Sequence, residues 1–206
     1  MARYTGPVCR LCRSEGTKLF LKGLRCATGK CAYERRPVPP GMHGRTRKKT
    51  TAYGLQLREK QKLRRVYGVL ENQFRIYFAH ASSKKGITGD TLLQMLESRL
   101  DNVVYRAGFG TSRTLARQMV NHALMTVNGR RVNIASFQVR AGDVVGVRTR
   151  ERARTKTKAE ISLNESYVPP DWIQVDREKL TATIVRLPAR QDVSLQVNES
   201  LVVEFY

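Results

Sequence analysis

Residues 98–148 read SRLDNVVYRAGFGTSRTLARQMVNHALMTVNGRRVNIASFQVRAGDVVGVR and contain signals for two helices and a hairpin. A helical spacing of apolar residues ends at the glycines of GFG, residues 108–110, and Ser112 is suited to cap a second helix. Asn128 and Gly129 stand between short apolar segments and predict a tight turn. The VVGV segment at 144–147 predicts a further strand. We therefore predict two helices packed on a small antiparallel sheet.

Arginines recur on this predicted fold. Arg113 and Arg117 are four residues apart, so we expect them to share the outer face of the second helix. Arg130 and Arg131 follow the turn of the hairpin. We expect all four side chains to contact the phosphates and sugars of a nucleic acid.

The charge of the whole chain favours the same partner. Its 206 residues carry a formal net charge of +21, which predicts a polyanionic partner. Basic and acidic side chains number 22 and 6 in residues 1–100, 12 and 3 in residues 101–158, and 4 and 8 in residues 159–206. No stretch resembles a signal peptide or a membrane span, and no basic helix has a broad apolar face, so we expect a soluble, cytoplasmic nucleic-acid binder.

All four cysteines lie within the first thirty-one residues, at Cys9, Cys12, Cys26 and Cys31. Two short pairs of thiolates separated by a loop are typical of a structural site for tetrahedral Zn²⁺. An iron–sulfur cluster uses the same ligands and stays open as an alternative. Two disulfides are disfavoured without a secretory signal, and a thioredoxin-like redox site lacks its βαβ surroundings.

Cations surround these cysteines. We expect them to lower the pKa values of the thiols, to offset the charge of four thiolates and to meet phosphates. They are Arg10, Arg13, Lys18, Lys22, Arg25 and Lys30.

Residues 34–54 follow as an extended basic arm, because their prolines exclude helix. His43 in this arm is interpreted as an RNA or solvent contact. From Tyr53 a helical spacing of apolar residues predicts two helices broken near Gly68, and Asp90 is placed to cap another. Together with the arginines of residues 98–148, this part of the chain supplies the expected RNA contacts. They are Arg35, Arg36, Arg45, Arg47, Lys48, Lys49, Arg58, Lys62, Arg64, Arg65, Arg113, Arg117, Arg130 and Arg131.

Residues 98–148 resemble the small RNA-binding fold found in ribosomal small-subunit protein four, in some pseudouridine synthases and in tyrosyl-tRNA synthetases. The resemblance to bacterial members of the ribosomal small-subunit protein four family extends over nearly the whole chain and is weakest across 150–180. It includes the cysteine cluster, PPGMHG, REKQKLRRVYGVLENQF and the final VNESLVVEFY. Met42 stands where the family has glutamine.

This resemblance implies a primary binder of small-subunit rRNA at a helical junction of the 5′ domain, which acts early in assembly. It also implies a place beside the channel through which mRNA enters, where Arg45, Arg47, Lys48 and Lys49 match the family's mRNA contacts by position. A contact with ribosomal small-subunit protein five that influences decoding accuracy is implied as well, and the net acidic C-terminal block suits a protein partner.

Two other functions compete with this one. SRLD at 98–101 resembles the catalytic tripeptide of pseudouridine synthases, but Asp101 falls inside the predicted first helix and the chain leaves no room for a catalytic domain. We therefore expect Asp101 to cap a helix or to pair with Arg99 or Arg106 rather than to act in an enzyme. A zinc-dependent regulator that binds DNA is the other alternative.

The predicted fold class is α+β. A zinc knuckle and basic arm occupy residues 1–45, and a mostly helical domain occupies 46–96 and is completed by 191–206. The RNA-binding domain occupies 97–190, with its core fold at 98–148, and strands near 173–175 and 182–185 extend its sheet. For the last ten residues we expect a helix capped by Asn198 that returns to the helical domain.

Overall fold

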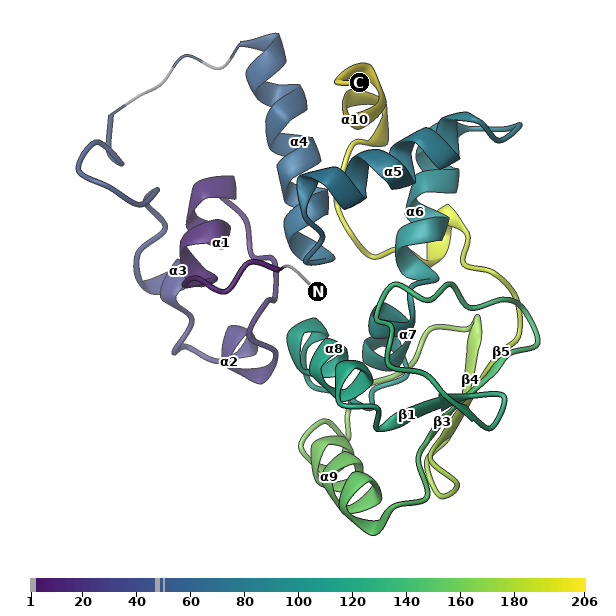
Figure 1. The fold of residues 1–206 in the computed structure, drawn as a ribbon. Coiled ribbons are helices and arrows are strands. Elements are labelled where there is room, and N and C mark those ends of the chain that lie inside the picture. Colours follow the sequence, from purple (N-terminus) through teal and green to yellow (C-terminus); the bar gives the residue numbers. More distant parts are fainter. Residues whose placement is uncertain (1–2, 47–48, 50) are drawn as a thin grey trace. The chain divides into compact units, whose positions relative to one another are not determined.

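The computed structural model describes residues 3–46, 49 and 51–206. Figure 1 shows the chain coloured along its sequence. The chain forms two compact units, Met1–Leu92 with Leu195–Tyr206, and Leu93–Ser194. We describe each unit by itself.

The first unit consists of helices. They are α1 (Cys9–Glu15), α2 (Leu24–Ala27), α3 (Ala32–Arg35), α4 (Ala52–Val66), α5 (Glu71–Ser82), the start of α6 (Thr88–Glu97) and α10 (Glu199–Glu204). The predicted break near Gly68 is confirmed, because α4 ends at Val66 and Gly68 adopts a φ of 63°. Asp90 does not cap α6, since the helix begins two residues earlier, at Thr88.

The end of the chain returns to this unit as predicted. The Asn198 side chain accepts a hydrogen bond of 3.1 Å from the N–H of Ser200 and caps α10, which packs on α4. The hydroxyl of Tyr206 donates to Glu71 at 2.7 Å, and its ring stacks on Phe78 with centroids 4.5 Å apart. A helix was therefore the correct prediction for the last ten residues.

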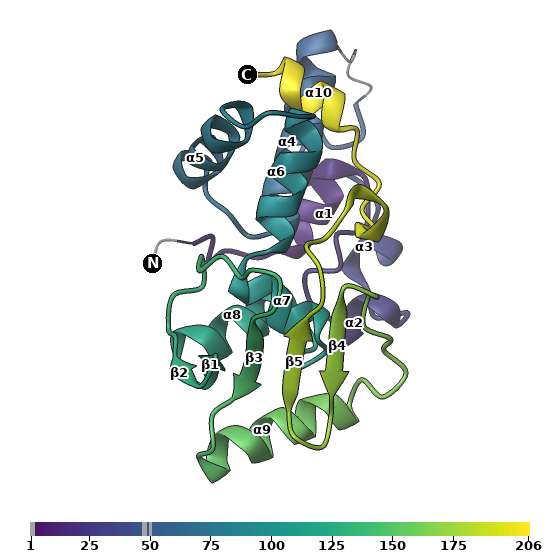
Figure 2. The same cartoon turned by 90° about the vertical axis from the view of Figure 1, so that its right-hand side faces the viewer.

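The second unit combines helices with one sheet. Its elements are the end of α6, α7 (Leu100–Arg106), α8 (Arg113–Asn121), β1 (Met125–Val127), β2 (Arg130–Arg131), β3 (Val144–Val147), α9 (Glu151–Ser162), β4 (Ile173–Asp176), β5 (Thr181–Ile184) and the 3₁₀ turn η1 (Arg190–Asp192). The strands pair antiparallel in the order β2-β1-β3-β5-β4. Figure 2 shows β3, β5 and β4 side by side. The predicted α+β fold with helices on an antiparallel sheet is confirmed.

Local signals account for the start of this unit. Ser112 accepts a hydrogen bond of 3.3 Å from the N–H of Leu115 and caps α8. Asn128 and Gly129 both take positive φ, 50° and 76°, as a two-residue turn between β1 and β2 requires. The hydrophobic core of this unit combines residues of α7, α8 and the sheet, and its fully buried side chains include Phe109 and Trp172.

The helix α9 was not predicted. Its buried residues, Ala153 and Thr157, are one turn apart and form a narrow, weakly apolar stripe among cations. No helix in the described part of the chain has the length and apolar character needed to cross a membrane.

Candidate nucleic-acid interface

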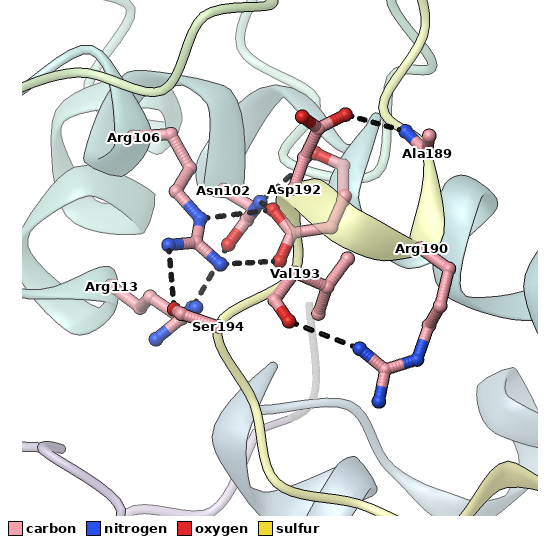
Figure 3. Close-up of polar contacts among 9 residues, drawn as sticks. Asn102, Arg106, Arg113, Ala189, Arg190, Asp192, Val193 and Ser194 are labelled. Carbon is pink, nitrogen blue, oxygen red and sulfur yellow. Dashed lines mark hydrogen bonds and ion pairs between the residues drawn. The ribbon is translucent and has the colours of Figure 1, made fainter.

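A buried polar network joins α7 to α8 in the second unit. Arg106 donates two hydrogen bonds to the carboxylate of Glu97, at 2.7 and 3.0 Å, and Asn102 donates to the carbonyl oxygen of Glu97 at 2.9 Å. The Oδ1 atom of Asn102 accepts from Nε of Arg113 at 2.9 Å. Figure 3 shows Asn102, Arg106 and Arg113 converging beside Ser194. Because each buried charge has a partner, the network can exist in a protein interior.

Asp101 lies in a second cluster of buried charges. Its carboxylate accepts from Nε and Nη2 of Arg99, at 3.1 and 2.9 Å, and from Nη1 of Arg117 at 3.3 Å. Asp101 is 4% exposed and Arg117 is 7% exposed. The expected pairing of Asp101 with Arg99 is confirmed, whereas Arg106 pairs with Glu97 instead.

The two arginines of α8 therefore do not share an outer face. That expectation is wrong for Arg117, because the ion pair with Asp101 holds it in the interior. Arg113 is half-buried, and its guanidinium lies 4.5 Å from the centroid of the Tyr105 ring. A guanidinium stacked on an aromatic ring is held in one orientation. Arg113 therefore lies in a fixed position at the beginning of α8.

The hairpin arginines lie at the surface, as predicted. Arg130 and Arg131 form β2 and are both exposed. The helix α9 adds cations that the sequence reasoning did not select as RNA contacts, of which Arg152 and Lys158 are exposed. The sequence signal for this helix is weak, because Ala153 and Thr157 are the only residues that α9 buries.

The cations predicted on α4 are engaged with carboxylates. Arg64 donates to Glu71 at 3.0 Å, and Lys62 pairs with Glu59. Arg58 and Arg65 both pair with Glu15 of α1, whose side chain is fully buried. Burial raises the pKa of Glu15, while the charges of Arg65 and Arg58 oppose that rise. The ion pairs of Arg58 and Arg65 with Glu15 thus tie α4 to α1. This contact was not predicted from the sequence.

The extended arm is shorter than the predicted residues 34–54, because α3 ends at Arg35 and α4 begins at Ala52, and this part of the chain presents the remaining predicted contacts. Arg35, Arg36, Arg45 and Lys49 are exposed. Arg47 and Lys48 lie outside the described residues. Arg13 fixes the beginning of the arm by donating from Nε to the carbonyl oxygen of Val38 at 2.7 Å.

The four cysteines are free thiols, and Cys12, Cys26 and Cys31 are buried. Burial raises the pKa of Cys12, and the charges of the other three cysteines raise it further. Burial also raises the pKa of Cys26. The net pKa shifts of Cys12 and Cys26 are therefore upward, contrary to the expectation, although the charge of Lys18 does lower the pKa of Cys26.

The backbone already supplies N–H groups to these sulfurs. The backbone N–H of Lys22 donates to the sulfur of Cys26 at 3.4 Å, and the backbone N–H of Leu19 donates to Cys12. Such contacts stabilise thiolates, and four sulfurs form a donor set suited to zinc. Within residues 3–46, 49 and 51–206, however, no three or more His, Cys, Asp or Glu side chains are arranged to hold a metal ion. The chemistry of the cysteines fits a zinc ion, and the arrangement of their side chains does not by itself form a site.

Comparison with known proteins covers the whole chain. Residues 3–97 match the family described as "Ribosomal protein S4/S9 N-terminal domain", and residues 98–145 match the "S4 domain". Over 207 residues the chain is 58% identical to "Small ribosomal subunit protein uS4" of Natranaerobius thermophilus and to that of Desulfitobacterium hafniense. Each alignment covers 100% of this chain and 99% of the relative. The protein of the same name from Dictyoglomus turgidum is 54% identical over 206 residues.

Proposed function

This chain belongs to the family of small ribosomal subunit protein uS4, and on that basis we propose that it is a structural constituent of the small ribosomal subunit and binds its rRNA. The full-length similarity to relatives that bear this name carries the proposal. The net charge of +21 and the exposed cations of the hairpin and arm support it. An enzymatic role for Asp101 is disfavoured, because that carboxylate is buried and paired with two arginines.

The finer proposal is that the protein binds a helical junction in the 5′ domain of small-subunit rRNA and nucleates assembly there. A transcript of that domain should bind more tightly than duplex DNA of matched length at the same salt concentration. Equal affinity for the two nucleic acids would instead favour the alternative of a DNA-binding regulator.

We also propose that the arm lies beside the channel through which mRNA enters and that it influences translational accuracy. The family resemblance supports this placement, and the exposure of Arg45 and Lys49 agrees with it. The net acidic residues 159–206 suit a contact with ribosomal small-subunit protein five.

We propose in addition that Cys9, Cys12, Cys26 and Cys31 hold one zinc ion. Zinc bound by four thiolates would supply folding energy to a segment with a small core of its own. The spacing of the four cysteines and the backbone N–H groups directed at two of the sulfurs support this assignment. An iron–sulfur cluster on the same ligands is the alternative, and visible absorption of the purified protein distinguishes the two.

The hairpin arginines provide a test of how RNA is held. Replacing Arg130 and Arg131 together with glutamine should weaken binding of the 5′-domain transcript without changing base preference, because these side chains are expected to meet phosphates. Each phosphate contact contributes roughly −0.9 to the slope of log K against log salt concentration, so the magnitude of the slope should fall by about one to two.

Lys179→Gln is the matched control for this measurement. Lys179 is exposed in the turn between β4 and β5, within the net acidic part of the chain, and its loss should leave the slope unchanged. If the slope changed equally in the control and in the double variant, the hairpin would not be part of the RNA-binding surface. Arg117 is unsuitable for this test, because its replacement would disturb the buried ion pair with Asp101.

A further inference from the structure

Phe20 combines an unfavourable backbone conformation with an exposed ring. Its φ is +49°, in the left-handed region that bulky residues avoid, and 50% of its surface is exposed. The preceding residue, Leu19, is 3% exposed and belongs to the core. An exposed phenylalanine held in a strained conformation contributes little to folding, and such strain is concentrated at functional sites.

The cysteine cluster holds Phe20 in this conformation from both sides. On one side the N–H of Leu19 hydrogen-bonds Cys12, and on the other the N–H of Lys22 donates to the sulfur of Cys26 at 3.4 Å. Both sulfurs belong to buried residues. The backbone before and after Phe20 is therefore fixed to the same cluster.

One cation lies beside the exposed ring. Nζ of Lys18, which also pairs with Glu34, lies 5.9 Å from the centroid of the Phe20 ring. Lys22 and Arg25 follow in the sequence and are both exposed. An aromatic face bordered by cations is complementary to a nucleotide, because the base can stack on the ring while the phosphate meets the cations. A protein partner with an apolar surface would meet unfavourable charge at the same place.

We propose that Phe20 is a platform on which one unpaired base of the small-subunit rRNA stacks, an inference that rests on the proposed function. The base comes from a loop, bulge or junction, since bases inside an A-form helix do not offer their faces. The contact would add a single-stranded element to an interface that otherwise holds RNA through its phosphates.

The decisive variant is Phe20→Gly. Glycine tolerates positive φ, so this change removes the ring while it relieves strain in the backbone. Its affinity for the 5′-domain transcript should fall roughly 5- to 150-fold, the range for the loss of one base–aromatic stack. Its thermal stability and metal content should equal or exceed those of the wild type. Leu24→Ala, at a residue of α2 that is 40% exposed, should bind within about twofold of the wild type.

Two further variants separate stacking from a general apolar contact. Phe20→Leu should bind about as weakly as Phe20→Gly, whereas Phe20→Trp should bind as the wild type does. The tryptophan of this last variant should lose fluorescence when RNA binds, and the single native tryptophan, Trp172, is fully buried and should report no such change in the wild type.

The possible outcomes are distinct. Failure of the wild type to bind the transcript would overturn the proposed function itself. Tight binding by the wild type together with equal binding by Phe20→Gly would overturn the stacking contact alone. Wild-type affinity in Phe20→Leu would also overturn it, because leucine offers no aromatic face.

Discussion

Replacing Cys26 with serine is expected to unfold the segment around the cysteines and to leave the second unit intact. A four-thiolate zinc site supplies about 10–16 kcal/mol of apparent binding free energy in small zinc-dependent folds. Without it, α1, α2 and α3 have few buried apolar residues besides Leu19 and the cysteines. Residues 3–46 should therefore become sensitive to protease, while residues 93–194 should stay resistant.

Elemental analysis and limited proteolysis check this expectation together. The purified wild type should contain about one zinc per chain, and Cys26→Ser should contain much less. Ser14→Ala, a change on α1 outside the ligand set, is the control and should retain the metal. A metal-free wild type whose N-terminal segment resists protease would contradict the prediction. Stoichiometric iron with visible absorption would show that the cysteines hold an iron–sulfur cluster instead of zinc.

Because Glu15 of α1 pairs with arginines of α4, we expect Cys26→Ser to affect α4 as well. The buried carboxylate of Glu15 pairs with Arg65 and Arg58. Loss of the folded cysteine segment would remove this partner from both arginines. Protection of the α4 backbone from hydrogen exchange should therefore decrease in Cys26→Ser around Arg65, and it should remain unchanged in α8 of the second unit.

The sequence predicted the elements whose signals are local. Asn128 and Gly129 specify a turn, Ser112 and Asn198 cap their helices, and glycine at position 68 separates α4 from α5. Each signal depends on residues within one turn of the chain, so the partner of each polar group is close in the sequence. The corresponding elements appear where they were expected.

Features that depend on distant partners could not be predicted in the same way. Arg117 follows Arg113 by one helical turn and therefore resembled a residue of an exposed basic face, but its partner Asp101 lies sixteen positions earlier, on α7. The pairing of Glu15 with Arg65 spans fifty positions. A count of charges treats these arginines as surface groups, and only the fold shows that carboxylates already engage them.

The candidate site was predicted unevenly for this reason. The exposure of Arg130 and Arg131 follows from the hairpin itself. The involvement of α9 was missed, because two small residues, Ala153 and Thr157, are all that this helix buries. Neither side chain gives a strong apolar period, whereas the same spacing with leucine would have indicated a helix at once.

Asp101→Ala is expected to destabilise the second unit by about 3–5 kcal/mol, the usual cost of removing one partner from a buried ion pair. The change would leave Arg99 and Arg117, which are 1% and 7% exposed, without the carboxylate that balances them. Trp172 is the single tryptophan and is fully buried in this unit, so its fluorescence during urea unfolding reports the loss directly. Glu178→Ala, at an exposed position between β4 and β5, should change the free energy of unfolding by less than about 0.5 kcal/mol.

A second substitution distinguishes the ion pair from a simple loss of side-chain volume. In wild-type protein Arg117→Met removes one of the two arginines that pair with Asp101, whereas in Asp101→Ala it removes an arginine that has already lost this carboxylate. Arg117→Met should therefore cost less stability in the Asp101→Ala background than in the wild type, with a coupling free energy of about 0.5–3 kcal/mol. Strict additivity would mean that Asp101 and Arg117 do not interact energetically. If Asp101→Ala left stability unchanged, the carboxylate would no longer have a structural explanation, and the resemblance of SRLD to a catalytic tripeptide would need testing with an RNA substrate.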